Sequence, residues 1–291
     1  MSESISNINW FPGHMAKTRR KISESLSLVD AVVEIVDARI PLSSRNPELK
    51  EIIQTKPVLI LLNKCDMADQ KATSIWINHF RQSGITALAV DCKSGKGINL
   101  IVPTLKEMLK EKLEQNAAKG MAGKPLRIMV AGIPNVGKSS FINKMAKSNR
   151  ARVEDRPGVT RGNQWFSVSK ELELLDTPGV LWPKFEDQSV GLKLAFTGAV
   201  KDTVLDIETL ATEFLRFTAK NYKPLFDARY KTEIDPEKEP YDLLCDIGRK
   251  RGMVIRGGEV DTERAAVMLM DEYRKGALGK LTLEWAGEEN A

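Results

Sequence analysis

The sequence predicts an α/β domain followed by a small all-helical domain. Three observations favour this fold class: short apolar runs suited to buried strands alternate with helical segments, a glycine-rich loop follows one of these runs, and the tail has helical apolar spacing. We expect the first domain to cover residues 1–200 and the second to cover residues 201–291.

Composition sets the frame for these two domains. The 291 residues are 42% hydrophobic and 29% charged, which is typical of a soluble chain, and the net charge of +5 mildly favours a polyanionic partner. The three cysteines lack the paired spacing of a zinc site, so a reduced, cytoplasmic compartment is expected. No apolar run is long enough to span a membrane. We therefore expect no membrane partner. We also expect the protein to be a monomer.

The first predicted helix covers residues 16–29, after the turn-like segment WFPGHM at residues 10–15. Basic side chains crowd its start: Lys17, Arg19, Arg20 and Lys21. They form either a solvated face or a contact with RNA phosphates, and the sequence leaves both interpretations open.

Two buried strands are predicted next, at residues 31–36 and 58–62, with a short helix between them. The first ends in Asp37, Ala38 and Arg39; the second leads into Asn63, Lys64, Cys65 and Asp66. Open α/β sheets bind ligands at the carboxyl ends of their strands. A carboxylate at Asp66 can accept hydrogen bonds from N1–H and N2–H₂ of guanine, whereas adenine presents a lone pair there. A plain surface loop is the alternative.

A helix near residues 69–82 precedes another strand at residues 85–90 and the loop Asp91, Cys92 and Lys93. A backbone N–H of Cys92 or Lys93 can donate to guanine O6, an atom that adenine replaces with an amino group. Residue type alone makes this a weak signal. Residues 98–113 are predicted to be a helix, and residues 114–125 a polar linker.

The central motif is GIPNVGKSS at residues 132–140, between an apolar strand at residues 126–131 and a helix at residues 139–146. It matches the phosphate-loop pattern, in which backbone N–H groups and the helix dipole bind phosphate oxygens. Lys138 is expected to reach the β- and γ-phosphates, and the Ser139 hydroxyl to ligate Mg²⁺. The nucleotide-binding residues expected in this loop are Asn135, Val136, Gly137, Lys138, Ser139 and Ser140.

Two segments after this loop complete the set. Thr160, in RPGVT at residues 156–160, is the expected second protein ligand of Mg²⁺. Strands at residues 164–168 and 172–175 lead to Asp176, which is expected to hold Mg²⁺ through water, and to Gly179, whose N–H can bond the γ-phosphate.

These motifs occur in an unusual order, because the guanine-reading loops precede the phosphate loop. The chain therefore resembles a circularly permuted Ras-like GTPase, with residues 114–125 joining the former ends. More closely, it resembles the ribosome biogenesis GTPase A family, also called RbgA or YlqF. The segments that carry this resemblance are WFPGHMAK, NKCD, GIPNVGKSS, PGVT, DTPG and LWPKFED.

The resemblance implies a cytoplasmic bacterial GTPase that assists late maturation of the large ribosomal subunit, is stimulated by that subunit and ends in an RNA-binding helical domain. Asp91 departs from the family, which often has Ser there, but backbone donors tolerate the change. The position of the Ras-like catalytic Gln is Val180, which has no polar side-chain atom. The resemblance implies that His14 positions water and that Asn135 binds K⁺; a plain polar loop residue is the alternative for His14.

The tail is predicted to form helices at residues 204–219, 241–249 and 261–275, with Asp261 as an N-cap. A basic patch, interspersed with acids, contains Arg249, Lys250, Arg251 and Arg256. Other functions stay open at this level: an RNA scaffold in which GTP is structural, a GTPase acting on tRNA or on a protein partner, and an ATPase.

Overall fold

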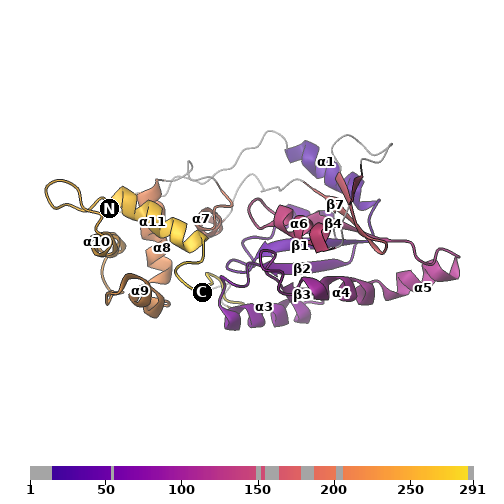
Figure 1. The fold of residues 1–291 in the computed structure, drawn as a ribbon, viewed down its shortest axis with the longest axis horizontal. Coiled ribbons are helices and arrows are strands. Elements are labelled where there is room, and N and C mark those ends of the chain that lie inside the picture. The colour runs from indigo at the N-terminus through magenta and orange to yellow at the C-terminus, as the bar shows by residue number, and fades with distance from the viewer. Residues whose placement is uncertain are drawn as a thin grey trace.

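The computed structural model describes residues 15–53, 56–148, 152–154, 164–177, 187–200 and 206–287. An α/β domain occupies one end of the molecule and a helical domain the other (Figure 1). Among the described residues, no helix combines the length and apolar composition needed to cross a bilayer.

The α/β domain contains a seven-stranded sheet with the strand order β3-β2-β1-β4-β7-β6-β5. The strands are β1 (Ala31–Asp37), β2 (Val58–Asn63), β3 (Thr86–Ala89), β4 (Leu126–Ala131), β5 (Arg152–Glu154), β6 (Gln164–Ser169) and β7 (Leu172–Asp176). Five neighbouring strands, β3, β2, β1, β4 and β7, are parallel to one another. Strands β6 and β5 extend the sheet beyond β7 with antiparallel pairs. The predicted strands are confirmed, whereas β5 was not predicted.

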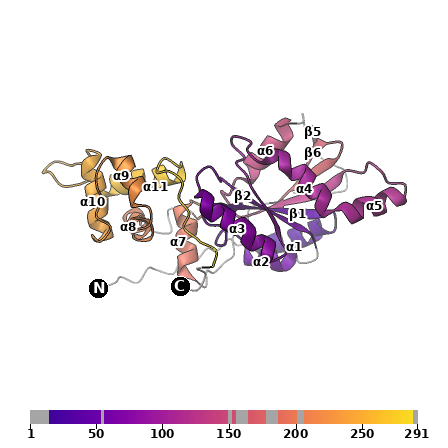
Figure 2. The same ribbon diagram turned by 90° about the horizontal axis from the view of Figure 1, so that it is seen from below.

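Helices cover both faces of this sheet (Figure 2). They are α1 (Met15–Leu26), α2 (Pro47–Ile52), α3 (Gln70–Gln82), α4 (Ile101–Met108), α5 (Lys110–Ala118) and α6 (Lys138–Ser148), with a 3-10 turn at Ile98–Leu100. Val32 and Val36 of β1 belong to the apolar clusters under α1, α2 and α3, whereas Val33 and Ile35 belong to the cluster that contains α4 and α6 side chains. Because both faces are covered, the central strands are continuously apolar.

The segment between β3 and β4 differs from the prediction. The expected helix over residues 98–113 is divided at Leu109, and the expected linker is helical to Ala118. All of residues 114–118 (EQNAA) except Asn116 are good helix formers, so the helix continues although none of its side chains is buried. Helix α5 lies at the end of the α/β domain that is farthest from the helical domain (Figure 1).

The helical domain contains α8 (Ile207–Thr218), α9 (Lys223–Tyr230), α10 (Pro240–Lys250) and α11 (Thr262–Arg274). Asp261 is the N-cap of α11, as predicted, and accepts a hydrogen bond from Arg264 N. Two helices were not predicted: α9, and α7 (Gln188–Phe196). Helix α7 precedes the domain boundary that we propose at residue 200, yet it packs against α8 and α11.

The end of the described chain returns to the α/β domain. Leu281 N donates to Met67 O at 3.0 Å, and Leu283 N donates to Arg39 O at 2.8 Å. The carboxylate of Glu284 accepts hydrogen bonds from Leu42 N and Ser43 N. This segment therefore fastens the helical domain beside the loops that follow β1 and β2.

Candidate nucleotide site at the carboxyl edge of the sheet

The loops after β1, β2, β4 and β7 all leave the same edge of the sheet, because these strands are parallel. Strand β1 lies between β2, which precedes the NKCD loop, and β4, which precedes the phosphate loop. Strands β2 and β3 are added on one side of β1, and β4 and β7 on the other side, so the strand order switches at this point. This is the kind of position where open α/β sheets bind ligands.

The phosphate loop needs its two glycines. Gly132 has φ +149°, and a Cβ there would lie 2.5 Å from Ile35 O; Gly137 has φ +103°, and a Cβ there would lie 2.3 Å from Asn63 Nδ2. Both positions combine positive φ with close contact, so a side chain would displace the loop. Helix α6 begins directly afterwards, at Lys138.

The Lys138 ammonium lies inside this loop and donates to Gly132 O and Ile133 O, each at 3.0 Å. Burial lowers the pKa of Lys138 to about 8, although the nearby Asp176 carboxylate opposes the shift. Ser139 and Ser140 are exposed in the first turn of α6, whereas Val136 is buried. The loop thus presents a cation and a helix N-terminus, which together favour a phosphate ligand.

Asp176 ends β7 close enough to Lys138 for the two charges to interact. Burial raises the pKa of Asp176, and Lys138 counteracts part of that rise. Its Oδ1 atom is buried and has no hydrogen-bond partner within the described part of the chain. An unpaired carboxylate oxygen and the Ser139 hydroxyl suit Mg²⁺, which prefers oxygen ligands and keeps several waters.

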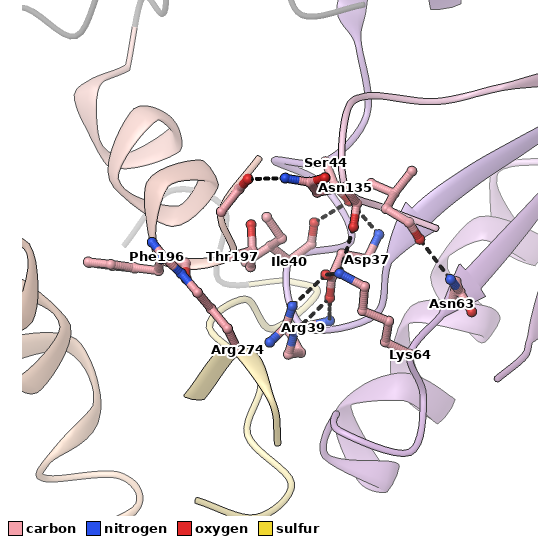
Figure 3. Close-up of polar contacts among 12 residues, drawn as sticks. Asp37, Arg39, Ile40, Ser44, Asn63, Lys64, Asn135, Phe196, Thr197 and Arg274 are labelled. Carbon is pink, nitrogen blue, oxygen red and sulfur yellow. Dashed lines mark hydrogen bonds and ion pairs between the residues drawn. The ribbon is translucent and has the colours of Figure 1, made fainter. Parts of the chain in front are cut away.

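Asn63 joins three loops with one side chain. Its Nδ2 donates to Val136 O of the phosphate loop at 2.7 Å, and its Oδ1 accepts from Cys92 N at 3.0 Å. Lys64 makes a second link, since its Nζ donates to Asn135 O at 2.7 Å (Figure 3). These contacts hold the NKCD loop against the phosphate loop. Asp66, three residues after Asn63, is exposed.

The loop after β3, at residues 91–94, is held by its own polar groups. The Asp91 carboxylate accepts from Lys93 N at 2.8 Å and from Ser94 N at 3.2 Å. Burial raises the pKa of Asp91, but hydrogen bonds from Ser94 and Lys93 outweigh burial and hold that pKa below its ordinary value. Both N–H groups expected to reach guanine O6 therefore bond within the protein here, Cys92 N to Asn63 and Lys93 N to Asp91.

Cys65 and Cys92, in the loops after β2 and β3, are protonated near neutral pH. Burial raises the pKa of Cys92 to about 12 and also raises the pKa of Cys65. Neither thiol is a nucleophile in this setting. The described residues contain no cluster of three His, Cys, Asp or Glu side chains that could hold a metal ion.

Asp37 and Arg39 are polar residues of this edge for which no role was predicted. Asp37 Oδ2 accepts from Lys64 Nζ at 2.9 Å and from Arg39 Nη2 at 2.7 Å (Figure 3). Only their position in the sequence could have indicated a role, because Asp37 ends the strand that lies between the strands preceding the two nucleotide loops.

The helical domain also contacts the phosphate loop. The Asn135 side chain donates through Nδ2 to Gly198 O, just after α7. Arg274, at the end of α11, donates to Phe196 O at 3.1 Å and to Ala195 O at 2.9 Å. Figure 3 shows these side chains converging between the domains. His14, Thr160 and Gly179 lie outside the described residues.

The basic groups noted in the sequence are partly neutralised. Arg20 pairs with Glu24 at 2.8 Å on an exposed helix face. Arg251 pairs with Glu272 at 2.9 Å, and Arg249 with Asp246 at 3.2 Å, whereas Lys250 and Arg256 are exposed. The described patch is therefore weaker in net charge than its arginine count indicates.

Comparison with known proteins agrees with the geometry. A family model described as "50S ribosome-binding GTPase" matches residues 127–234, which include the phosphate loop. The guanine-reading candidates lie before the matched region, as the permuted order requires. GNP-bound YlqF from T. maritima is similar in structure, with a TM-score of 0.62 and 26% identity over 92% of this chain and 98% of that one. The circularly permuted GTPase fold is thereby shown.

Sequence relatives extend over nearly the whole chain. Ribosome biogenesis GTPase A of Bacillus licheniformis is 49% identical over 277 residues, which cover 95% of this chain and 98% of the relative. The protein of the same name from Bacillus cereus is also 49% identical, over 95% of this chain and 93% of the relative. The chain therefore belongs to the ribosome biogenesis GTPase A family.

Proposed function

We propose that this chain binds GTP at the carboxyl edge of its sheet and hydrolyses it as a cytoplasmic assembly factor in late maturation of the large ribosomal subunit. The direct contact between the NKCD loop and the phosphate loop carries the proposal, because one nucleotide can then touch both. Family membership supports the ribosomal role, since the relatives are named for ribosome biogenesis. We further propose that the chain contacts rRNA through its helical domain.

Guanine selection is assigned to the NKCD loop. The exposed Asp66 carboxylate would accept from N1–H and N2–H₂ of the base, and the Lys64 stem would pack over the ring. Asn63 acts indirectly, because its side chain holds the NKCD loop against Val136 and Cys92. Cys65, Asp91 and Cys92 shape the base pocket. Adenine would leave the Asp66 charge facing a lone pair, so ATP is disfavoured.

Phosphate binding is assigned to the backbone N–H groups of residues 135–140 and to the Lys138 ammonium. Oxygen atoms of Ser139, Thr160 and, through water, Asp176 would hold Mg²⁺, a fit supported by the unpaired Oδ1 of Asp176. When bound, Mg²⁺ neutralises charge on the β- and γ-phosphate oxygens. The N–H of Gly179 would bond the γ-phosphate and register its loss.

Hydrolysis requires a water that attacks the γ-phosphorus while the bond to the β–γ bridging oxygen breaks, giving GDP and phosphate. Val180 cannot orient that water, so we assign this task to His14. K⁺ would bind at Asn135 through Oδ1, since Nδ2 donates to Gly198 O. We propose that the large subunit and K⁺ both accelerate turnover.

The test is GTP hydrolysis by the full chain with purified large subunits, with small subunits and with neither, each in K⁺ and in Na⁺. We expect large subunits to raise the hydrolysis rate, small subunits to leave it unchanged, and the rate to be higher in K⁺ than in Na⁺. The Lys138→Met variant controls for contaminating phosphatase, and His14→Ala should lose the stimulated rate. Equal rates with both subunits would refute the ribosomal role, equal rates in K⁺ and Na⁺ would refute the K⁺ site, and wild-type turnover by His14→Ala would refute its assignment.

A further inference from the structure

We propose that Asp37 is a positioning residue for Lys64, and that Arg39 makes this positioning depend on the contact between α11 and the α/β domain. The proposal rests on the nucleotide site proposed above. It predicts that nucleotide affinity responds to a change at the end of α11, although no residue of α11 is assigned to the pocket.

Asp37 ends β1, where a strand in the middle of the sheet delivers its last side chain between the two nucleotide loops. Its side chain is 2% exposed and accepts from Arg39 Nε at 2.9 Å and Nη2 at 2.7 Å. Burial raises the pKa of Asp37, but the Arg39 and Lys64 charges outweigh burial and hold that pKa well below its ordinary value. The carboxylate is therefore ionised near neutral pH.

Lys64 is held at two points. Its Nζ donates to Asp37 Oδ2 at 2.9 Å and to Asn135 O at 2.7 Å, and its backbone has φ +61°. A lysine side chain loses substantial rotamer entropy when it is fixed. Because Asp37 supplies the charged anchor, the conformation of Lys64 is set before a base arrives. Preorganisation of this kind increases affinity.

Arg39 extends this arrangement to the helical domain. Its side chain is 1% exposed, and Nη1 donates to Tyr273 O in the last turn of α11 at 3.2 Å. Its guanidinium carbon lies 4.8 Å from the centroid of the Tyr273 ring. Arg39 O also accepts from Leu283 N. The partner of Asp37 is thus buried partly by the helical domain, so moving α11 would change the environment of the Asp37 carboxylate.

Strand β1 provides a matched comparison in a second buried ion pair. Glu34 is 1% exposed and accepts from Arg45 Nε at 3.0 Å and Nη2 at 2.8 Å. The Arg45 guanidinium lies 5.5 Å from the Phe80 ring, which belongs to α3. Both pairs are carboxylate–arginine pairs under an aromatic ring, but only Asp37 also bonds a residue of the proposed pocket.

The first experiment measures the affinity of the full chain for a fluorescent GDP analogue, together with the melting temperature, in wild type, Asp37→Asn, Lys64→Met and the double variant. We expect Asp37→Asn to weaken binding about tenfold, the scale of losing a hydrogen bond between charged groups. The double variant should bind no more weakly than Lys64→Met. Glu34→Gln is the control: it should lower the melting temperature and leave affinity unchanged.

Wild-type affinity in Asp37→Asn, or losses that multiply in the double variant, would overturn the positioning role. A merely structural Asp37 would affect the melting temperature without this dependence on Lys64. If the wild type itself fails to bind GDP, the proposed function fails first, which separates the two outcomes.

The second experiment tests the link to α11 and leaves every pocket residue in place. Tyr273→Leu removes the ring beside Arg39. We expect affinity to fall about threefold, which is less than the full contribution of a buried cation–π contact, because Arg39 acts on Lys64 only through Asp37. Tyr273→Phe keeps the ring and should bind normally. Phe226→Leu, in the same core, controls for general weakening of the helical domain. Wild-type affinity in Tyr273→Leu would overturn the coupling. If Asp37→Asn does not fold, the affinity of Tyr273→Leu alone tests the proposal.

Discussion

Different interactions hold the carboxyl edge of the sheet and the core of the helical domain. At the sheet edge, side chains such as Asn63 and Lys64 make directed hydrogen bonds between loops. In the helical domain, Phe214 packs 4.5 Å from Tyr273 and 5.5 Å from Phe196, measured between ring centroids. The helical core therefore relies on apolar area, which is not directional.

This difference indicates what a substitution should change in each region. Removing a ring from the helical core leaves a cavity and lowers the free energy of unfolding, whereas removing a polar group from the sheet edge alters ligand affinity first. Asp37 and Arg39 are the place where the two regions meet, since Arg39 contacts both Asp37 and Tyr273.

The largest effect on stability is expected from Phe226→Ala. The Phe226 side chain is fully buried, and its ring lies near Phe214 and Tyr230, with centroids 6.5 and 6.3 Å away. Its loss should reduce the free energy of unfolding of the helical domain by about 3–5 kcal/mol, measured by urea denaturation. Nucleotide affinity of the folded protein should stay within about twofold of wild type, because the substitution leaves a cavity away from the sheet edge. A large loss of affinity without a loss of stability would contradict the distinction between the regions.

A middle-sized effect is expected from pH at Lys138. Its pKa of about 8 in the folded chain lies below the ordinary value of 10.5. Below pH 8 the ammonium is already charged, but above it phosphate binding must take up a proton, so affinity should fall, approaching about tenfold per pH unit. Titration of the GDP analogue from pH 7 to 10 measures this slope, and Lys138→Met should remove it. A slope unchanged in that variant would assign the titration to another group.

The same shift has an opposite consequence for folding. Between about pH 8 and 10.5 the unfolded chain binds more protons at Lys138 than the folded chain does, so this group makes the free energy of unfolding rise with pH in that window. The unfolding free energy of wild type minus that of Lys138→Met should therefore increase from about pH 8 to about pH 10.5. A difference that decreases across this window would contradict a lowered pKa.

The smallest effect is expected from Lys275→Ala on the surface of the helical domain. Lys275 pairs with Asp271 at 2.9 Å, but the two side chains are 73% and 52% exposed. Exposed pairs of this kind contribute about 0–0.5 kcal/mol, and salt weakens them further. Urea denaturation should barely distinguish this variant from wild type, and a loss comparable with Phe226→Ala would show that surface charge matters more than the packing indicates.

Local sequence patterns predicted the parts of the fold that local physics decides. Strand β4 covers Leu126–Ala131, as expected, because an apolar run before a glycine loop has few alternatives. The predicted ends of the helix after β3 were wrong. Residues 114–118 can form either a linker or a helix, and no side chain of α5 is buried to favour one of them.

The candidate site was predictable in its loops and not in its connections. The NKCD loop and the phosphate loop carry recognisable spacing, so each loop could be found from the sequence. The bonds from Arg39 to Tyr273 O and from Asn135 to Gly198 O join residues far apart in the sequence, and nothing in either segment points to its partner. Helix α9 was missed for a related reason: it is short and depends on packing against its neighbours.

The central claim is that a carboxylate after β2 selects the base of a nucleotide whose phosphates bind after β4. Competition of GDP, ADP and XDP for the wild-type chain and for Asp66→Asn tests it most directly, since an asparagine can donate to the C2 oxygen of xanthine. We expect wild type to prefer GDP, and Asp66→Asn to weaken GDP binding roughly 100-fold while gaining affinity for XDP. Equal binding of ADP and GDP by wild type, or unchanged GDP binding by Asp66→Asn, would contradict the account.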